Sequence, residues 1–429
     1  MKIKIYKNGK VNLIKICVML ALFTTSFDIV GMINIAGFNF RFSQFIILPV
    51  ILSWFFCAIK GKIQLPTGWK SLFLFMIFQF VFMFRSPNLK NAVGYFMWLL
   101  FDIIIIFSIV YYLNKAFHFQ WLIHIYMKSF VFISILGLIQ FILYLLGINF
   151  FVVQTWNNRL ARINGFCYEP SYYATYLIMG FILYSYFVKQ KNESIFPLKV
   201  LKRDLIIITL ALFLCSSRMG WLVMLLWILL IMIVEYGKLF INKLTKKKMF
   251  FLVFIVPLFF IGIIVIYYIF IRGKVDLTFF LQGMGILGTS AHSSSSRING
   301  LIRCIKIFKE SPFFGYSLGG VDPVIAQYLG IPYSTLNNGK GASIIGELLV
   351  ACGLIGIVPL LNYFKTLIFK SIKYKEEYTA LAWAFGFELF ILCFNQNILR
   401  PYFWWHIAIL SAAVSNLKID KMKIHKNNT

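Results

Sequence analysis

Apolar stretches of membrane-spanning length recur from one end of the chain to the other. A helix needs about 20 mostly apolar residues to cross a bilayer, and twelve stretches of this sequence approach that length. They cover residues 12–30, 43–59, 70–84, 93–113, 127–147, 172–188, 205–217, 220–241, 250–271, 343–368, 378–395 and 402–417. Charged residues make up only 13% of the chain, about half of their share in a soluble domain. The sequence therefore predicts an all-α fold, in which residues 1–429 form one integral membrane bundle of about 12 transmembrane helices.

Lysine and arginine are divided between the two sides of this bundle. With both termini on the cytoplasmic side, 27 of the 32 lysines fall in cytoplasmic connections and nine of the ten arginines fall on the outer side. The lysines follow the positive-inside rule, so the net charge of +28 sets orientation and does not predict nucleic acid binding. The outer arginines need another explanation, and guanidinium groups grip phosphate through paired donors. This division predicts a membrane protein that handles an anionic substrate on its outer side.

One outer connection, residues 272–342, is far longer than the others and separates the ninth and tenth expected spans. Loops of this length are usually functional or disordered. Within it, Arg297–Lys309 has an apolar face at helical spacing and a basic face opposite. The apolar positions are Ile298, Leu301, Ile302, Ile305 and Phe308. We expect a basic amphipathic helix that lies on the membrane surface or caps a cavity, ended by Ser311-Pro312.

Two outer arginines stand in settings that suit an anion. Arg218 lies between two apolar spans beside Ser216, Ser217 and Gly220, small residues that let a ligand approach the guanidinium. An arginine at a membrane boundary is costly without a partner or a water-filled cavity, although a side chain that snorkels to lipid headgroups fits the same position. Arg297 opens the expected amphipathic helix after four serines, where free N–H groups and the helix dipole favour anions. A serine cap with a solvated arginine is the alternative.

Two acidic residues and a tyrosine are candidates for work on a sugar. Glu169 precedes Pro170 at the start of the sixth span, either as ordinary helix-start chemistry or as a carboxylate that accepts sugar hydroxyls or a proton. Glu347 lies about one turn into the tenth span, and intramembrane acids tend to face a cavity. Tyr172 is placed to stack on a sugar ring, although aromatic residues are expected at a membrane interface in any case.

The other arginines fall into two groups by context. Further candidates for binding an anionic substrate are Arg159, Arg162, Arg303 and Arg400. Headgroup or loop residues are expected at Arg41, Arg85 and Arg272. The seven cysteines contain no Cys-x-x-Cys pair and histidine is scarce, so the sequence predicts no metal site and no cofactor.

Four segments, in their order along the chain, resemble the superfamily of O-antigen polymerases and O-antigen ligases. Residues 165–171 resemble its G-x-x-x-E-P element, and residues 217–218 resemble its serine–arginine element between two spans. Residues 297–320 resemble its loop pattern of arginine, amphipathic helix and S-P-x-x-G-x-G. Residues 347–356 resemble its late span with a glutamate and two glycines. The ordered set is more specific than any single element.

The resemblance implies an enzyme of the bacterial cytoplasmic membrane that transfers glycans carried by undecaprenyl pyrophosphate among the lipids of the outer leaflet. Ligases of this superfamily have a histidine near the end of the large loop, at about the position of Ala342 here. Without that histidine the chain resembles the polymerase branch, which joins repeat units into a surface polysaccharide such as O-antigen or capsule. A chain-length regulator and a flippase of the same pathway are implied as partners.

The implied reaction gives the candidate residues roles. A hydroxyl of one lipid-linked unit attacks the sugar C1 of another, and negative charge grows on the departing pyrophosphate. Arg218 and Arg297 are expected to stabilise that charge in place of a metal ion. Glu169 or Glu347 is expected to orient or deprotonate the attacking hydroxyl.

Two rival interpretations remain beside a purely structural membrane scaffold, against which the outer arginines argue. One is a ligase-type glycan transferase of the same superfamily, against which only the missing histidine counts. The other is a 12-span polysaccharide transporter or flippase. Such transporters are typically built from two related halves, whereas here the long loop lies only in the second half.

Overall fold

Helices make up nearly all of the regular structure in the part of the chain that the computed structural model describes. That part covers residues 6–7, 10–11, 13–35, 38–61, 63–113, 116–156, 160–189, 202–240, 291–336, 343–374, 376–394 and 398–427. The strands there form only short antiparallel hairpins. These hairpins are β1 (Tyr6–Lys7) with β2 (Lys10–Val11), β3 (Ile33–Ile35) with β4 (Phe38–Phe40), and β5 (Gln154–Trp156) with β6 (Leu160–Arg162).

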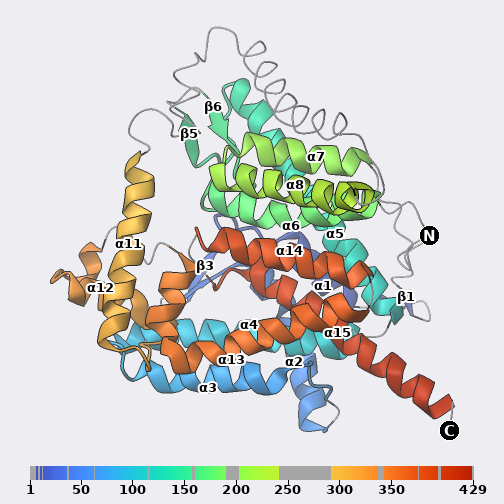
Figure 1. The fold of residues 1–429 in the computed structure, drawn as a ribbon, viewed down its shortest axis with the longest axis horizontal. Coiled ribbons are helices and arrows are strands. Elements are labelled where there is room, and N and C mark those ends of the chain that lie inside the picture. The colour runs from blue at the N-terminus through green and yellow to red at the C-terminus, as the bar shows by residue number, and fades with distance from the viewer. Residues whose placement is uncertain are drawn as a thin grey trace.

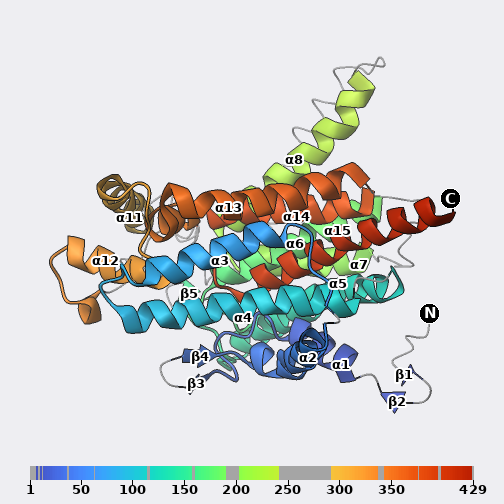
Figure 2. The ribbon, with the colours of Figure 1, turned by 90° about the horizontal axis from the view of Figure 1, so that it is seen from below.

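Most of the helices run roughly alongside one another in a single bundle (Figure 1). They are α1 (Leu13–Phe23), α2 (Phe42–Ile59), α3 (Trp69–Met83), α4 (Leu89–Leu113), α5 (Ala116–Leu145), α6 (Pro170–Lys189), α7 (Lys202–Leu214), α8 (Arg218–Phe240), α11 (Ala291–Glu310), α12 (Val321–Tyr328), α13 (Ile344–Tyr374), α14 (Glu376–Leu392) and α15 (Pro401–Asn427). Two 3-10 turns, η1 (Leu318–Gly320) and η2 (Tyr333–Thr335), flank α12. The hairpin β1–β2 and the end of α15 lie at one end of the bundle, and α11 and α12 lie at the other (Figures 1 and 2).

The all-α membrane class predicted from the sequence is confirmed. The helices 42–59, 89–113, 118–145 and 344–373 are long and apolar enough to cross a membrane. Among the described residues, every other expected span also coincides with a helix, although the total of twelve stays a prediction. The span expected at 250–271 lies outside the described residues.

Two span boundaries differ from the prediction for local reasons. The helix α5 begins at Ala116, well before residue 127. Lys128 therefore lies inside the helix and not in a loop, and its ammonium pairs with the Asp204 carboxylate of α7 at 2.7 Å. The helix α1 ends early, at Phe23. The hydroxyls of Thr24 and Thr25 donate to the carbonyls of Leu20 and Leu22, and such bonds compete with the helical ladder.

The amphipathic segment of the long outer loop lies within α11, which begins six residues before Arg297. Its buried face carries Cys304 and Ile307, whereas the predicted apolar residues Ile298, Ile302 and Ile305 are exposed. The buried face differs from the predicted apolar face because small residues make the contact between α11 and α13. A Cβ added at Gly346 would lie 3.1 Å from the Cβ of Cys304, so the two helices meet at close range.

The helix α13 is interrupted at Gly353, whose φ of 54° and ψ of −174° are not helical. The loop segment after α11 pairs with the interruption. The N–H groups of Tyr316 and Ser317 donate to the carbonyls of Val350 and Ala351, each at 3.0 Å. A bond of 2.8 Å runs from the N–H of Leu354 to the carbonyl of Pro312. The backbone groups released by the break therefore find partners, as buried amides require.

Side chains from α3 and α4 hold the same loop segment from the other side. The Gln79 carboxamide accepts a hydrogen bond from the N–H of Leu318 at 2.9 Å and contacts the sulfur of Cys352. The amide of Asn91 donates to the carbonyl of Gly319 at 2.6 Å. The loop between α11 and α12 is thereby fixed to α3, α4 and α13.

We expect Gly315→Ala to destabilise the protein, because the added Cβ would collide with the carbonyl of Ala351. Overpacking of this kind costs about 1–3 kcal/mol. The purified variant should therefore show a lower melting temperature in detergent than the unmodified protein. Gly386→Ala is the matched control, since nothing lies within 4 Å of the added Cβ and alanine favours a helix interior. Equal melting temperatures for the two variants would contradict the close packing of the loop against α13.

Candidate functional site

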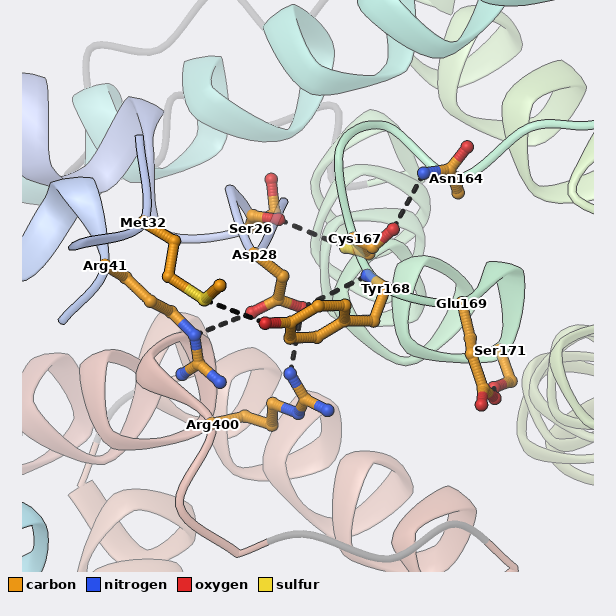
Figure 3. Close-up of polar contacts among 10 residues, drawn as sticks. All are labelled: Ser26, Asp28, Met32, Arg41, Asn164, Cys167, Tyr168, Glu169, Ser171 and Arg400. Atoms are coloured by element: carbon orange, nitrogen blue, oxygen red, sulfur yellow. Dashed lines mark hydrogen bonds and ion pairs between the residues drawn. The ribbon is translucent and has the colours of Figure 1, made fainter. Parts of the chain in front are cut away.

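Asp28 lies between two buried arginines from distant parts of the chain (Figure 3). Its carboxylate is 2.8 Å from Nε of Arg41 and 2.9 Å from Nη1 of Arg400. The exposed fractions are 1% for Asp28, 5% for Arg41 and 4% for Arg400. Counted without the nearby Asp102 carboxyl, the three ionised groups carry one surplus positive charge. A buried surplus of this sign attracts an anion.

Aromatic rings cover both guanidinium groups. Arg400 lies 3.9 Å from the ring centre of Tyr172 and 5.5 Å from that of Tyr168. Arg41 lies 5.0 Å from the ring centre of Trp98. Such contacts stabilise a desolvated cation. The face of Tyr172, predicted from the sequence to stack on a sugar, is thus turned to Arg400.

The two arginines have spare hydrogen-bonding capacity in the described part of the chain. Nη1 of Arg41 and Nε of Arg400 are buried without a hydrogen-bond partner. The carboxyl of Asp102, 1% exposed, also lacks a hydrogen-bond partner and is close enough to interact electrostatically with Arg41. Buried polar groups are normally satisfied, so this unsatisfied set marks the cluster as a candidate site.

Backbone contacts explain how Asp28 reaches this position. After α1 ends, the N–H groups of Asp28 and Ile29 both donate to the carbonyl of Phe166, at 2.9 and 3.1 Å. The segment that receives them turns sharply, with φ of +51° at Gly165 and +69° at Phe166. A Cβ on Gly165 would collide with the ring of Tyr173. Glycine is therefore required at the first position of the G-x-x-x-E-P element.

Cys167, in the middle of that element, connects the arginine cluster to the turn between α7 and α8. It is fully buried and lies within electrostatic reach of Asp28, Arg400 and Cys215. Burial raises the pKa of the Cys167 thiol well above its ordinary value, so the group stays a neutral thiol and not a nucleophile. Cys215 is three residues before Arg218, so Cys167 is also near the α7–α8 turn.

Glu169 opens α6, as helix-start chemistry predicts. Its carbonyl accepts from the N–H groups of Tyr172 and Tyr173, and its carboxylate accepts from the hydroxyl of Ser171 at 3.0 Å. The side chain is half-buried and lies away from Asp28 (Figure 3).

Two predicted arginines meet at the α7–α8 turn. The guanidinium of Arg162 donates to the side chain of Gln154 at 2.7 Å and to the carbonyl of Ser216 at 3.2 Å. Arg218 begins α8 with an exposed side chain that makes no hydrogen bond or ion pair with another described residue. The start of α8 packs on α6, where a Cβ on Gly220 would lie 2.9 Å from that of Ala174. An exposed guanidinium thus begins α8, whose start packs on α6.

Glu347 is connected to the same region through the segment before α15. Its side chain is 9% exposed, and its carboxylate accepts from the N–H of Ile398 at 3.4 Å. Ile398 lies two residues before Arg400. Both Glu347 and Arg400 are close enough to the Tyr95 hydroxyl to interact with it electrostatically.

The remaining predicted residues are less involved. Arg303 donates to the carbonyl of Asn299 in its own helix at 3.3 Å. Arg297 lies on α11, but its side chain is outside the described part, as is the whole of Arg159. Arg41, expected to be a headgroup or loop residue, is instead buried and ion-paired. Asp28 was no candidate at all. The only signal for Asp28 in the sequence was the scarcity of acidic residues, of which the whole chain has 14.

A family comparison covers the centre of the chain. Residues 205–361 match a family model described as O-Antigen ligase. This match supports a relation to the O-antigen ligases and polymerases over that part of the chain. The match includes the segment of Arg218 and that of Glu347, and it leaves out Asp28, Arg41 and Arg400. No curated protein and no solved structure matches the chain. The match and the apolar helices together point to a membrane-embedded protein, and the match supports an activity of the ligase or polymerase type.

Metal ligands do not cluster in the described ranges. No group of three or more His, Cys, Asp or Glu side chains there has an arrangement that would hold a metal ion. The cations of the site in these ranges are the guanidinium groups themselves.

We expect Asp28→Asn to destabilise the protein strongly, because it leaves two guanidinium groups buried without their carboxylate. Removing one member of a buried ion pair costs about 3–5 kcal/mol. The melting temperature in detergent should fall well below that of the exposed control Glu310→Gln. The double variant Asp28→Asn with Arg41→Gln should lose less than the sum of its single variants, since the residues are in contact. Strictly additive losses would show that the pair is not coupled.

Proposed function

We propose that this protein is a polymerase that joins undecaprenyl-pyrophosphate-linked repeat units into a surface polysaccharide at the outer leaflet of the bacterial cytoplasmic membrane. The observation that carries the proposal is the pair Arg41 and Arg400 on Asp28 against the loop of residues 163–171, with Arg162 just before that loop bonded to the turn that leads into Arg218. This loop includes the G-x-x-x-E-P element. A metal-free site for a pyrophosphate needs several guanidinium groups from different elements, and these arginines come from four.

The exposed and the buried arginines suit different tasks. Arg218, at a helix N-terminus with an unengaged guanidinium, is suited to contact the diphosphate directly. Arg41 and Arg400 are held by Asp28 and cannot turn outward without breaking a buried ion pair. We propose that they do not contact the diphosphate but create a fixed positive potential at the site. This potential lowers the energy of the negative charge that develops there during the reaction.

The reaction that follows is a direct displacement at the anomeric carbon. The oxygen of an acceptor hydroxyl forms a bond to C1 of the donor sugar, and the bond between C1 and the pyrophosphate oxygen breaks. The electron pair leaves with undecaprenyl pyrophosphate, whose added negative charge Arg218 and Arg297 stabilise. The hydroxyl proton passes to a carboxylate, for which Glu347 and Glu169 are the candidates.

Between these two carboxylates, Glu347 has the better setting. It is almost fully buried beside the segment that carries Arg400, whereas Glu169 is half-buried and bonded to Ser171. A general base must lie within hydrogen-bond reach of the proton that it accepts, and a carboxylate held beside the site by its surroundings meets this need better than one bonded at a helix start. We therefore propose that Glu347 accepts the proton of the acceptor hydroxyl.

A ligase is the second candidate, favoured by the description of the matching family as O-Antigen ligase. The polymerase is preferred because the position of the ligase histidine is occupied by about Ala342. Glycan profiles of a strain that lacks the protein distinguish the two. Loss of a polymerase should leave single repeat units attached to the surface acceptor. Loss of a ligase should leave long lipid-linked chains that are not attached, and this result would overturn the proposal.

We expect Arg218→Ala and Arg297→Ala to abolish long-chain polysaccharide while protein levels in the membrane stay normal. Removing one charge-stabilising donor typically costs about 100- to 1000-fold in rate. The measurement is the polymer ladder on a gel from complemented deletion strains, with immunoblots for the protein. Arg203→Ala is the matched control, because Arg203 is exposed and lies at the start of α7, on the predicted cytoplasmic side. Ordinary ladders from the Arg218 and Arg297 variants would refute their assignment.

A further inference from the structure

A group of hydroxyl and carboxylate side chains lies near the start of α12. The chain enters this region through residues 316–320, which are fixed to α13 and to α4 by hydrogen bonds. A Cβ on Gly319 would lie 2.5 Å from the carbonyl oxygen of Asn91. The backbone before Asp322 is thus held at close range, so the position of Asp322 is set by the fold and not by a free loop.

Tyr95 faces this segment from α4. It lies four residues after Asn91, and residues four apart share a face of a helix. Asn91 donates to the carbonyl of Gly319 from that face. The Tyr95 hydroxyl is accordingly within electrostatic reach of Asp322 and Glu347.

Glu347 faces the same segment from α13. It lies four residues before Ala351, whose carbonyl accepts the N–H of Ser317 at 3.0 Å. The adjacent Gly346 brings α11 against α13 at Cys304, and Cys304 interacts electrostatically with both Glu347 and Asp322. Two carboxylates therefore border one region, one from α13 and the other from α12.

Tyr333 adds a second phenol at the outer edge. Burial raises the pKa of Tyr333, and the nearby Asp322 carboxylate raises it further. The phenol stays neutral and is able to donate a hydrogen bond. Its side chain is 42% exposed and that of Tyr328 is 40% exposed, so aromatic surface lies next to the carboxylates.

The chemistry of this group does not suit a second phosphate, because two carboxylates repel an anion. Carboxylates accept, and neutral phenols donate and accept, which is the set of partners that sugar hydroxyls need. Aromatic rings beside them offer an apolar face for a pyranose ring. We infer that Tyr95, Asp322 and Glu347 form a subsite for the hydroxyl groups of the acceptor glycan. This inference rests on the proposed function and names the place where its second substrate binds.

The test uses the purified full-length protein in detergent and two probes. One is the free repeat-unit oligosaccharide, released by mild acid from lipid-linked units of a strain that lacks this protein. The other is undecaprenyl pyrophosphate alone. We expect each probe to raise the melting temperature of the unmodified protein. For Asp322→Asn and Tyr95→Phe, the apparent Kd for the oligosaccharide should rise about tenfold or more, as expected for a lost hydrogen bond to a charged group.

The second probe separates failure of the subsite from failure of the fold or of the proposed function. Both variants should keep their response to undecaprenyl pyrophosphate, which also shows that they are folded. The control Glu310→Gln, an exposed acid at the end of α11, should respond to both probes as the unmodified protein does. Unchanged oligosaccharide affinity in Asp322→Asn would overturn the subsite alone. An unmodified protein that responds to neither probe would overturn the proposed function and the subsite with it.

Discussion

Arginine keeps its charge in proteins, and a charge buried inside a membrane protein requires a partner of opposite sign. Arg41 and Arg400 share one such partner, Asp28. The N–H of Asp28 donates to the carbonyl of Phe166. This shared partner of the two arginines therefore holds together the α1–α2 connection, the loop before α6 and the start of α15. The positions of Tyr168 and Tyr172 follow from it, since their rings cover Arg400.

The second structural constraint is the break in α13 at Gly353. It exposes backbone groups that the outer loop then occupies, and the glycines of that loop allow the close approach. The two constraints meet at Glu347, six residues before the break and in contact with the segment that carries Arg400. The arginine cluster and Glu347 are therefore parts of one connected framework.

Local patterns predicted much of this fold. Apolar length located the helices, and the resemblance in residues 165–171 and 297–320 drew attention to glycines that the structure requires for close contact. The site was harder to predict, because it depends on pairs far apart in the sequence. Arg41 looked like a surface residue since its partner, Asp28, lies across a hairpin and its neighbour Arg400 near the other end of the chain. Helical periodicity of α11 also suggested a different buried face, because packing of Cys304 on Gly346 overrides the average apolar direction.

The separation of 372 residues between Asp28 and Arg400 has a consequence for biosynthesis. A membrane chain inserts from its N-terminus, so the pair of Asp28 and Arg41 is in place long before α15 is made. During that interval the carboxylate has one guanidinium instead of two, and the surplus positive charge does not yet exist. The complete cluster of one carboxylate and two guanidinium groups forms only when the last helix docks. In a chain that still lacks α15, Asp28 therefore holds Arg41 alone, and the contribution of Arg400 to the site comes last.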